Sequence, residues 1–457
     1  MSTKLKAESL SFFESIIMGV AGSAPAYSIA VAIAGLLGTA GKVSPNALLL
    51  FAVPMLGIAV AYKGLTAKMV NAGAAYEWTK SVFGGFFGYF SGWAVLIAAL
   101  VFMVTGSVPL GTATIDLYDP NLASNVWLTT GIGAVWFIAI GLVLIAGIEL
   151  TSKIQVVMST VELGILVIIS IAAYMHSVGH ALTPFTWSWF GFGYPAGTFA
   201  SSALITVFLY WGWDVTANLS EETKSEHNAA GKGGFLSIFA TIASFVAFTV
   251  AALMIFSLSD ATGYSDNLIY HVAIASGLGK TGGYAATLAL ILSSVATLET
   301  TMLQFSRTLF AMGRDHALPN YFGQVHERTV TPVRTMYLLL VLGLIMIFVS
   351  SFQSSISKIL TDSVAAISVQ VCYYYGLAGL VCAWVYKDSA KNSVGTLLQY
   401  VIYPALSAIA LFILAIYAFT TFDTLTKIVG AGGLLIGILF YRPSGWGRKV
   451  ANIVAEE

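Results

Sequence analysis

Twelve runs of mostly apolar residues divide this sequence, and each is long enough to cross a lipid bilayer as a helix. A membrane-spanning helix needs about 20 such residues, and inside a bilayer every backbone polar group must find its partner within the protein. The connecting segments are too short for a separate soluble domain. We therefore expect residues 1–457 to form one all-α polytopic membrane domain. The runs lie near residues 14–38, 47–69, 84–108, 126–147, 152–175, 199–219, 233–257, 282–312, 334–351, 358–384, 398–419 and 425–442.

The composition agrees with a bilayer as the solvent. Apolar residues make up 58% of the chain and charged residues 9%, whereas soluble domains carry roughly 25% charged residues. Lys plus Arg equals Asp plus Glu at 21 each, so the net charge indicates no nucleic-acid partner. The first apolar run is long enough to stay in the membrane, which argues against a cleavable signal peptide. Cys372 and Cys382 lie ten positions apart on one expected helix, too far for a disulfide.

The distribution of Lys and Arg sets the expected orientation. Short cytoplasmic loops of membrane proteins carry an excess of these residues. With twelve spans and a cytoplasmic N-terminus, seventeen of the 21 Lys and Arg residues fall on the inner side. We therefore expect a multi-pass protein of the cytoplasmic membrane with both termini in the cytoplasm. The four outer cations are Lys42, Lys280, Lys358 and Lys427.

Two of the runs contain residues that interrupt a helix near mid-membrane. In the first run, Pro25 lacks an N–H group and disfavours the α conformation of the residue before it. In the sixth run, Gly212 and Asp214 lie at similar depth within an aromatic segment. Irregular backbone at that depth is tolerated only where protein covers it or where it lines a cavity. One break is equally consistent with a kink in a packed helix, but two breaks five spans apart are typical of a transporter built from inverted repeats.

Three motifs resemble the amino acid–polyamine–organocation transporter superfamily, and the resemblance extends over nearly the whole chain. The most specific motif is SRTLFAMGRDHALPNYFGQVHERTVTP at residues 306–332, which follows the superfamily pattern almost position for position. The others are VFLYWGWDVTANLSEE at residues 207–222 and NAGAAY at residues 71–76. The first span departs, because many members carry a Gly-Ser-Gly motif where this chain has Gly-Ser-Ala-Pro-Ala at residues 22–26. That departure bears on the substrate rather than on the fold.

The resemblance implies the LeuT fold, a 5+5 inverted repeat in which helices 1 and 6 are discontinuous. The repeats would cover about residues 14–175 and 199–384, with two peripheral spans over about 398–442. Substrate would bind at the midplane. N–H groups that begin the outer half of span one would face a carboxylate, and carbonyls that end the inner half of span six would face an amine. The expected substrate-binding residues are Ala21, Gly22, Ser23, Ala24, Pro25, Ala26, Tyr27, Phe208, Tyr210, Trp211, Gly212, Trp213 and Asp214.

Three carboxylates fall near the centres of apolar runs, where an ionisable side chain indicates function by default. The resemblance places Glu162 where some sodium-independent members have a lysine that stands in for a sodium ion. A carboxyl group in an apolar setting can instead carry a proton. We therefore expect Glu162, and secondly Glu299, in proton coupling, although each is also compatible with a hydrogen-bonded packing role. Asp214 is expected either to pair with a substrate ammonium or to cap the second half-helix.

Aromatic side chains flank the sixth-span break. An aromatic face attracts an organic cation by about 0.5–2 kcal/mol, so we expect at least one of Tyr210, Trp211 and Trp213 to face the substrate. The tyrosine run at residues 373–375 is better explained by helix packing. We assign four polar residues at the inner end of the eighth span to structure or gating: Arg307, Arg314, Asp315 and His316.

Other functions leave signatures that this sequence lacks. It has no G-x-x-x-x-G-K-[ST] loop, no metal-ligand spacing among its histidines and no nucleophile–base pair, so we expect no cofactor, no metal and no enzyme. We predict secondary transport of amino acids or related small organic amines by alternating access, coupled to protons and independent of sodium. Because Pro25 removes one N–H donor, a polyamine or other amine permease is an alternative. Substrate exchange is another, a channel is the remote one, and the oligomeric state stays open.

Overall fold

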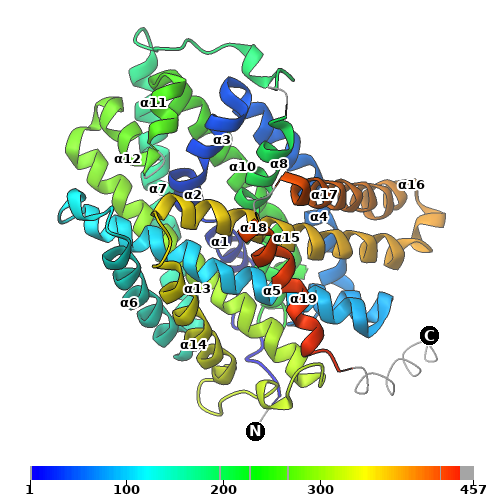
Figure 1. Ribbon diagram of the computed structural model, residues 1–457. Coiled ribbons are helices and arrows are strands. Elements are labelled where there is room, and N and C mark those ends of the chain that lie inside the picture. Colours follow the sequence, from blue (N-terminus) through cyan, green and yellow to red (C-terminus); the bar gives the residue numbers. More distant parts are fainter. Residues whose placement is uncertain (1–2, 195–196, 226–227, 265–266, 422–423, 443–457) are drawn as a thin grey trace.

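The computed structural model describes residues 3–194, 197–225, 228–264, 267–421 and 424–442. Over these ranges the chain forms helices and no strand, apart from one isolated bridge between Leu10 and Thr223. Figure 1 shows the helices packed in one bundle, with the N-terminus at the bottom and the helices α3 and α11 toward the top. We call the end that holds the N-terminus the inner end, and the end at which α3 finishes the outer end.

The bounds of the helices follow in chain order, with π- and 3₁₀-helices marked η. The first part contains α1 (Phe12–Ser23), α2 (Pro25–Ser28), η1 (Ile29–Ile33), α3 (Ala34–Ala40), η2 (Gly41–Val43), α4 (Ser44–Lys68), α5 (Ala75–Asp116), η3 (Pro120–Leu122), α6 (Val126–Ile145), α7 (Ile148–Ser177) and η4 (Trp187–Phe190). The middle contains α8 (Phe199–Leu209), α9 (Val215–Asn218), α10 (Ala229–Ile255), α11 (Leu258–Gly263), α12 (Leu268–Ala273), η6 (Ile274–Leu278), α13 (Gly279–Arg314) and η7 (Asn320–Phe322). The last part contains α14 (Val333–Ser350), α15 (Ile356–Tyr386), η8 (Ser389–Asn392), α16 (Val394–Thr396), η9 (Leu397–Ile402), α17 (Tyr403–Thr421), α18 (Thr424–Lys427), η10 (Ile428–Gly432), α19 (Gly433–Leu435) and η11 (Ile436–Leu439).

Nine helical stretches among the described residues are long and apolar enough to cross a membrane. The sequence predicted twelve, and three local features account for the difference. The stretch Phe12–Lys68 contains the first two expected runs, because only the short turn η2 separates α3 from α4. The sixth run is divided by its break into α8 and α9, and the twelfth is a short stretch, Ile428–Leu439. Every expected run therefore overlaps helix, and the chain is an all-helical, multi-pass membrane protein.

Two regions are more helical than the sequence predicted. The helix α5 begins at Ala75, well before the expected start at residue 84, and Gly84 interrupts it with φ of 83° and ψ of 176°. This positive φ, which glycine adopts readily, sets residues 75–83 apart as a short helix at the inner end. The connection before the eighth span also contains two short helices, α11 and α12.

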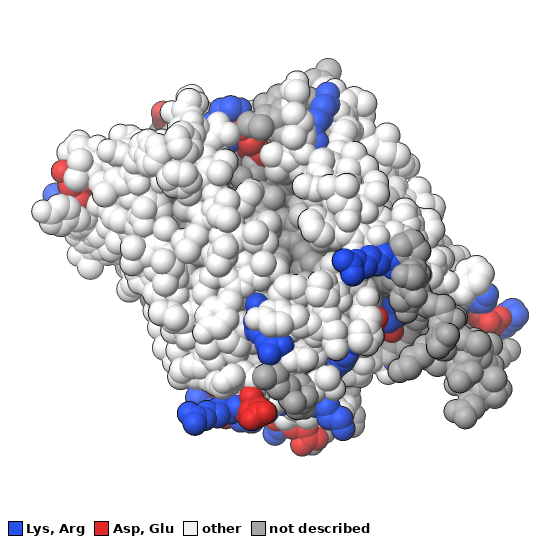
Figure 2. Space-filling view, turned by 60° about the horizontal axis from the view of Figure 1, so that its bottom comes forward, with Lys and Arg blue, Asp and Glu red and all other residues white. Residues whose placement is uncertain are grey.

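The bundle turns apolar side chains outward and keeps large side chains at its centre. Exposed residues such as Val135 on α6, Ile168 on α7 and Val341 on α14 form a surface suited to lipid. Figure 2, with the lower end of the molecule brought forward, shows a largely white surface on which Lys, Arg, Asp and Glu form separate groups. At the centre, α5 packs against α13 and α15, and α1 packs against α10 and α13. Cys372 and Cys382 are free and buried there, as predicted.

Candidate substrate site at two helix breaks

The two predicted helix breaks lie against each other at the centre of the bundle. A Cβ added to Gly212 would be 2.2 Å from the carbonyl oxygen of Gly22, and a Cβ added to Gly22 would be 2.2 Å from the carbonyl oxygen of Gly212. Gly212 also has φ of 103°, a conformation that side chains rarely allow. Glycine at both positions is therefore what permits this contact between the backbones of the two halves of the chain.

The first break separates α1 from α2 at Ala24. This residue is left-handed, with φ of 46° and ψ of 71°, and its N–H donates to the carbonyl of Val20 to close α1. Pro25 then begins α2 and has no N–H to offer. The freed carbonyl of Gly22 accepts a hydrogen bond of 3.0 Å from Thr297 Oγ1 on α13. The interruption expected around Pro25 is thus present, with its backbone held by a neighbouring helix.

Side chains from two other helices take the N–H groups that begin α2. Glu162 on α7 accepts from the Ala26 N–H at 2.9 Å, through Oε1. Ser293 on α13 accepts from the Tyr27 N–H at 3.0 Å and donates its hydroxyl to the same Glu162 oxygen at 2.6 Å. Glu162 Oε2 is buried and has no partner among the described residues. A carboxylate of the protein therefore occupies the place at which the sequence predicted a substrate carboxylate.

The second break lies between α8, which ends at Leu209, and α9, which begins at Val215. Asp214 stands at the N-cap position of α9 but makes no capping hydrogen bond, so the capping role considered for it is not realised. Its Oδ2 accepts instead from Gln304 Nε2 at 2.7 Å and from the Tyr374 hydroxyl at 3.0 Å. Its Oδ1 is buried without a partner among the described residues. Asp214 thus links the second break to α13 and α15.

The aromatic residues of the second break point in different directions. Tyr210 donates its hydroxyl to the Leu48 carbonyl at 3.0 Å, which ties it to α4 and away from the breaks. Trp211 donates Nε1 to the Tyr374 hydroxyl at 2.6 Å. Trp213 contacts the ring of Tyr375, with 5.7 Å between ring centroids, and its Nε1 has no partner within the described chain. The tyrosine run of α15 therefore does more than pack helices, since Tyr374 binds both Trp211 and Asp214.

A group of four aromatic rings covers the breaks on their outer side. Phe102 on α5 is 5.9 Å from Tyr27, 6.5 Å from Phe208 and 5.4 Å from Trp211, measured between ring centroids. Tyr27 is held by a hydrogen bond of 3.0 Å from its hydroxyl to the Thr105 carbonyl. We call these four residues the outer aromatic group. Sequence reasoning missed Phe102, because nothing in its apolar run distinguishes it from a packing residue.

Only one of the two carboxylates predicted for proton coupling touches the breaks. Ser293, Thr297 and Gln304 lie along the face of α13 that reaches them. Glu299 follows Thr297 by two positions, which is about 200° around a helix, so it lies on a different face. Glu299 is 2% exposed and makes no hydrogen bond to either break.

The three family-like motifs meet at the inner end of the molecule. Arg307 binds Glu222 through two hydrogen bonds, of 2.9 and 2.8 Å, and both side chains are fully buried. Arg314 binds Glu221 at 3.0 and 2.7 Å. Glu221 also accepts a hydrogen bond of 2.9 Å from the Ala72 N–H, which connects the motif of residues 71–76 to the other two motifs. These ion pairs confirm neither gating nor a purely structural role, but they join the three motifs at the inner end.

Further contacts tie neighbouring segments to these motifs. The N–H groups of Ser9 and Leu10 donate to the carbonyl of Glu222 at 2.8 and 3.0 Å. Lys80 bridges Glu77 and Asp315. For Asp315, burial is outweighed by the hydrogen bond and charge of Lys80, and its pKa is lowered.

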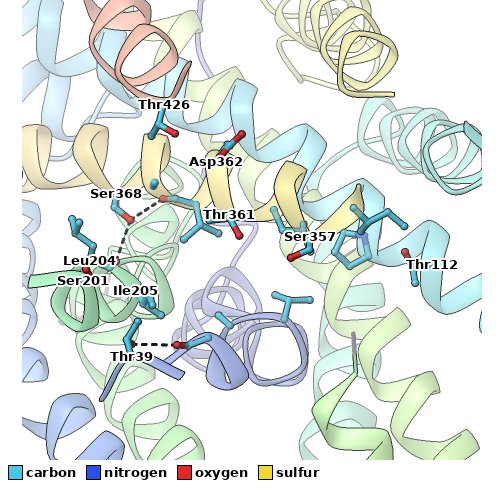
Figure 3. A pocket seen from close by; sticks show the side chains of 18 of the residues that line it. Thr39, Thr112, Ser201, Leu204, Ile205, Ser357, Thr361, Asp362, Ser368 and Thr426 are labelled. Atoms are coloured by element: carbon cyan, nitrogen blue, oxygen red, sulfur yellow. Dashed lines mark hydrogen bonds between the residues drawn. The ribbon is translucent and has the colours of Figure 1, made fainter. Parts of the chain in front are cut away.

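A cavity of about 860 Å³, which we call the vestibule, lies at the outer end (Figure 3). It is lined by residues of η1, α3, α5, α8 and α15, by Pro120 of η3 and the two residues 123–124, and by Thr426 of α18. Its apolar lining residues include Val31 and Leu204. These lie four positions beyond Tyr27 and four before Phe208, about one helical turn from the outer aromatic group. The predicted substrate-binding residues are all buried, and none of them lines the vestibule.

Comparison with known proteins gives a consistent result. Residues 10–439 match the model of the amino acid permease family. The branched-chain amino acid permease BcaP of Lactococcus lactis is 25% identical over 409 residues, which are 86% of this chain and 84% of that protein. The serine/threonine exchanger SteT of Bacillus subtilis is 22% identical over 387 residues, 80% of this chain and 83% of the exchanger. The vacuolar cationic amino acid transporter 8 of Arabidopsis thaliana is 26% identical over 267 residues, 57% of this chain and 42% of that transporter.

Proposed function

The chain belongs to the amino acid permease family, and from this membership and its two apposed helix breaks we propose a secondary transporter of amino acids or related small organic amines. The family and its relatives are permeases rather than enzymes. We propose twelve spans in a 5+5 inverted repeat. Spans one to five would form the first repeat, six to ten the second, and the last two would be peripheral. The contact of Gly22 with Gly212 is the observation that carries the proposal, because inverted-repeat transporters place their substrate between two broken helices.

Alternating access is supported by the unequal ends of the molecule. The outer end holds the vestibule, whereas buried ion pairs such as Arg307 with Glu222 join segments at the inner end. The excess of Lys and Arg in the expected inner loops supports an orientation in which the vestibule faces the outside of the cell and both termini lie in the cytoplasm. In this arrangement substrate enters from outside, passes the outer aromatic group and reaches the breaks. Opening the inner end then requires the ion pairs to separate.

We propose that substrate binds among the residues of the two breaks, 21–27 and 208–214. Trp211 and Phe208 supply aromatic surface on the outer side, and Asp214 supplies a buried carboxylate with one unpaired oxygen. An amine could bind this oxygen or the carbonyls freed by the breaks. Tyr210 is the exception, because its hydroxyl is already bound to α4.

Proton coupling is proposed to run through Glu162, with Glu299 as the less well placed carboxylate. An ionised Glu162 holds the Ala26 N–H and the Ser293 hydroxyl more strongly than a protonated one would. Protonation therefore loosens its contact with the start of α2 and frees donors for a substrate carboxylate. Proton and substrate binding would then favour each other, which is the differential affinity that coupled transport needs. We propose that no sodium ion takes part.

An amine without a carboxylate is the second candidate, and a specific observation favours it. Pro25 contributes no N–H, and the next two N–H groups of α2 are bound by Glu162 and Ser293. A substrate that lacks a carboxylate would not need to displace them. An uptake panel in proteoliposomes, comparing amino acids with polyamines with and without an inward proton gradient, separates the two candidates. Failure of every amino acid and amine to enter would refute the proposed function.

A further inference from the structure

The outer vestibule has a chemistry that the helix breaks lack. Of the described residues that line it, two are acidic and none is Lys, Arg or His. Asp116, which has an interaction partner of its own, comes from the end of α5, and Asp362 comes from the second turn of α15. Figure 3 shows Asp362 and several hydroxyl side chains around the same space. Eight lining residues carry hydroxyl groups: Thr39, Thr112, Ser124, Ser201, Ser357, Thr361, Ser368 and Thr426.

The cations near the vestibule stand outside it. Lys358 Nζ binds Asp362 Oδ2 at 2.9 Å, but the Lys358 side chain is 41% exposed while that of Asp362 is 16% exposed. Lys427 follows the lining residue Thr426, and neither lysine lines the cavity. A charge that is more exposed to solvent is screened more strongly by water and salt. The Asp362 carboxylate therefore acts on the interior of the cavity more strongly than the Lys358 ammonium group.

We propose that the vestibule is a capture site for the ammonium or guanidinium group of a cationic substrate. A cleft of one charge sign with poorly polarisable walls focuses its field and raises the local concentration of ligands of the opposite sign. The hydroxyl oxygens accept hydrogen bonds from the N–H groups of such a ligand. The inference rests on the proposed transport function and narrows its substrate class to organic cations. Neutral amino acids would gain little from the vestibule, and anionic ones would be disfavoured.

The size and floor of the vestibule make this capture a separate step from binding at the breaks. A cavity of about 860 Å³ exceeds the volume of a single amino acid and holds the substrate together with water. We call the apolar lining residues about one helical turn from the outer aromatic group its floor; they are Val31, Ala32, Leu204 and Ile205. A captured cation would therefore interact with the acidic wall, and the outer aromatic group would still lie between it and the breaks.

Two substitutions change the charge of the vestibule in opposite directions without touching the breaks. Asp362→Asn removes a negative charge from its wall, and Lys358→Met removes the positive charge that opposes it. Leu360→Met, at a lining position with neither charge nor hydroxyl group, is the matched control. The measurement is initial uptake into proteoliposomes of lysine, leucine and glutamate, at low and at high ionic strength. We expect Asp362→Asn to raise the KM for lysine by about three- to tenfold and Lys358→Met to lower it.

The outcomes separate this inference from the proposed function. The KM for leucine should stay within about twofold of wild type in every variant, and added salt should shrink the differences for lysine. Equal KM values for lysine in the two charge variants would overturn the inference. A change in the KM for leucine as large as the change for lysine would also overturn it, because it would indicate a structural effect rather than an electrostatic one. Uptake of leucine by the wild-type protein without uptake of lysine would also overturn it while leaving transport intact. Uptake of none of the three by the wild type would refute the proposed function itself.

Discussion

Replacement of Gly212 by valine tests the contact on which the proposed site depends. A Cβ at this position would be 2.2 Å from the Gly22 carbonyl oxygen and 2.6 Å from its carbonyl carbon. Both distances are shorter than a non-bonded contact allows, and both partners are backbone atoms that cannot rotate away. The left-handed φ of 103° adds about 1–3 kcal/mol of strain for a residue with a side chain. The strain is relieved only if the two breaks move apart.

Substrate affinity should fall by about 10- to 100-fold, if a strain of about 1.4–2.8 kcal/mol must be overcome to restore the binding geometry. The assay is equilibrium binding of labelled substrate to purified protein, with expression level and monodispersity in detergent as checks on folding. Gly131→Val is the matched control, because a Cβ at Gly131 on α6 meets nothing within 4 Å. Gly22→Ala should lower the substrate affinity as Gly212→Val does. The double variant should lose less binding free energy than the sum of the two single losses, because both substitutions disrupt the same contact. An affinity within twofold of wild type in the folded Gly212→Val protein would refute the reasoning.

Three further predictions address coupling and closure. Glu162→Gln should still bind and exchange substrate but lose the accumulation that an inward proton gradient drives. Glu299→Gln should change accumulation less. If both variants accumulate substrate as well as wild type and with the same pH dependence, the coupling proton is carried by another group. Uptake should persist when sodium is replaced by choline or potassium, and its collapse under that exchange would identify Glu162 as a cation ligand instead. Arg307→Met should lower the thermal midpoint of unfolding in detergent by leaving the Glu222 charge buried and unpaired, an effect of about 3–5 kcal/mol. The double variant with Glu222→Met should recover much of that loss, and a single variant as stable as wild type would count against the buried pair.

The sequence predicted the helices well because the bilayer imposes a simple rule. A segment that crosses it must be apolar and must satisfy its own backbone, so length and composition are nearly sufficient. The breaks were predictable for a related reason, since Pro25 lacks an N–H group and Gly212 tolerates a positive φ, and each weakens a helix at mid-span. Gly84 was not found by the same signal, because it is the first residue of the expected run 84–108, where a glycine suggests the start of a helix rather than a break within one.

Contacts between segments distant in sequence were not predictable in this way. Asp214 was expected either to bind substrate or to cap α9; it makes no capping hydrogen bond, and its Oδ2 accepts from Gln304 and Tyr374 instead. Both partners come from helices that lie far along the chain. Likewise, the motifs that contain Glu221 and Arg314 look independent in the sequence, and only their convergence at the inner end reveals that they pair. Local propensity contains no information about such pairing.

The position of Glu162 changes how the first break should be understood. From sequence, the break and the buried carboxylate were two separate signs of function, one for substrate and one for protons. They are one feature, because the carboxylate that would carry the proton binds the N–H that would receive the substrate. A fixed cation at this position could not accept that hydrogen bond. We therefore interpret the Gly-Ser-Ala-Pro-Ala sequence, which departs from Gly-Ser-Gly, and the carboxylate on α7 as two parts of one site. Pro25 removes one donor, Glu162 and Ser293 occupy the next two, and the substrate must either displace them or do without them. Which of these occurs decides between a proton-coupled amino acid transporter and an amine permease.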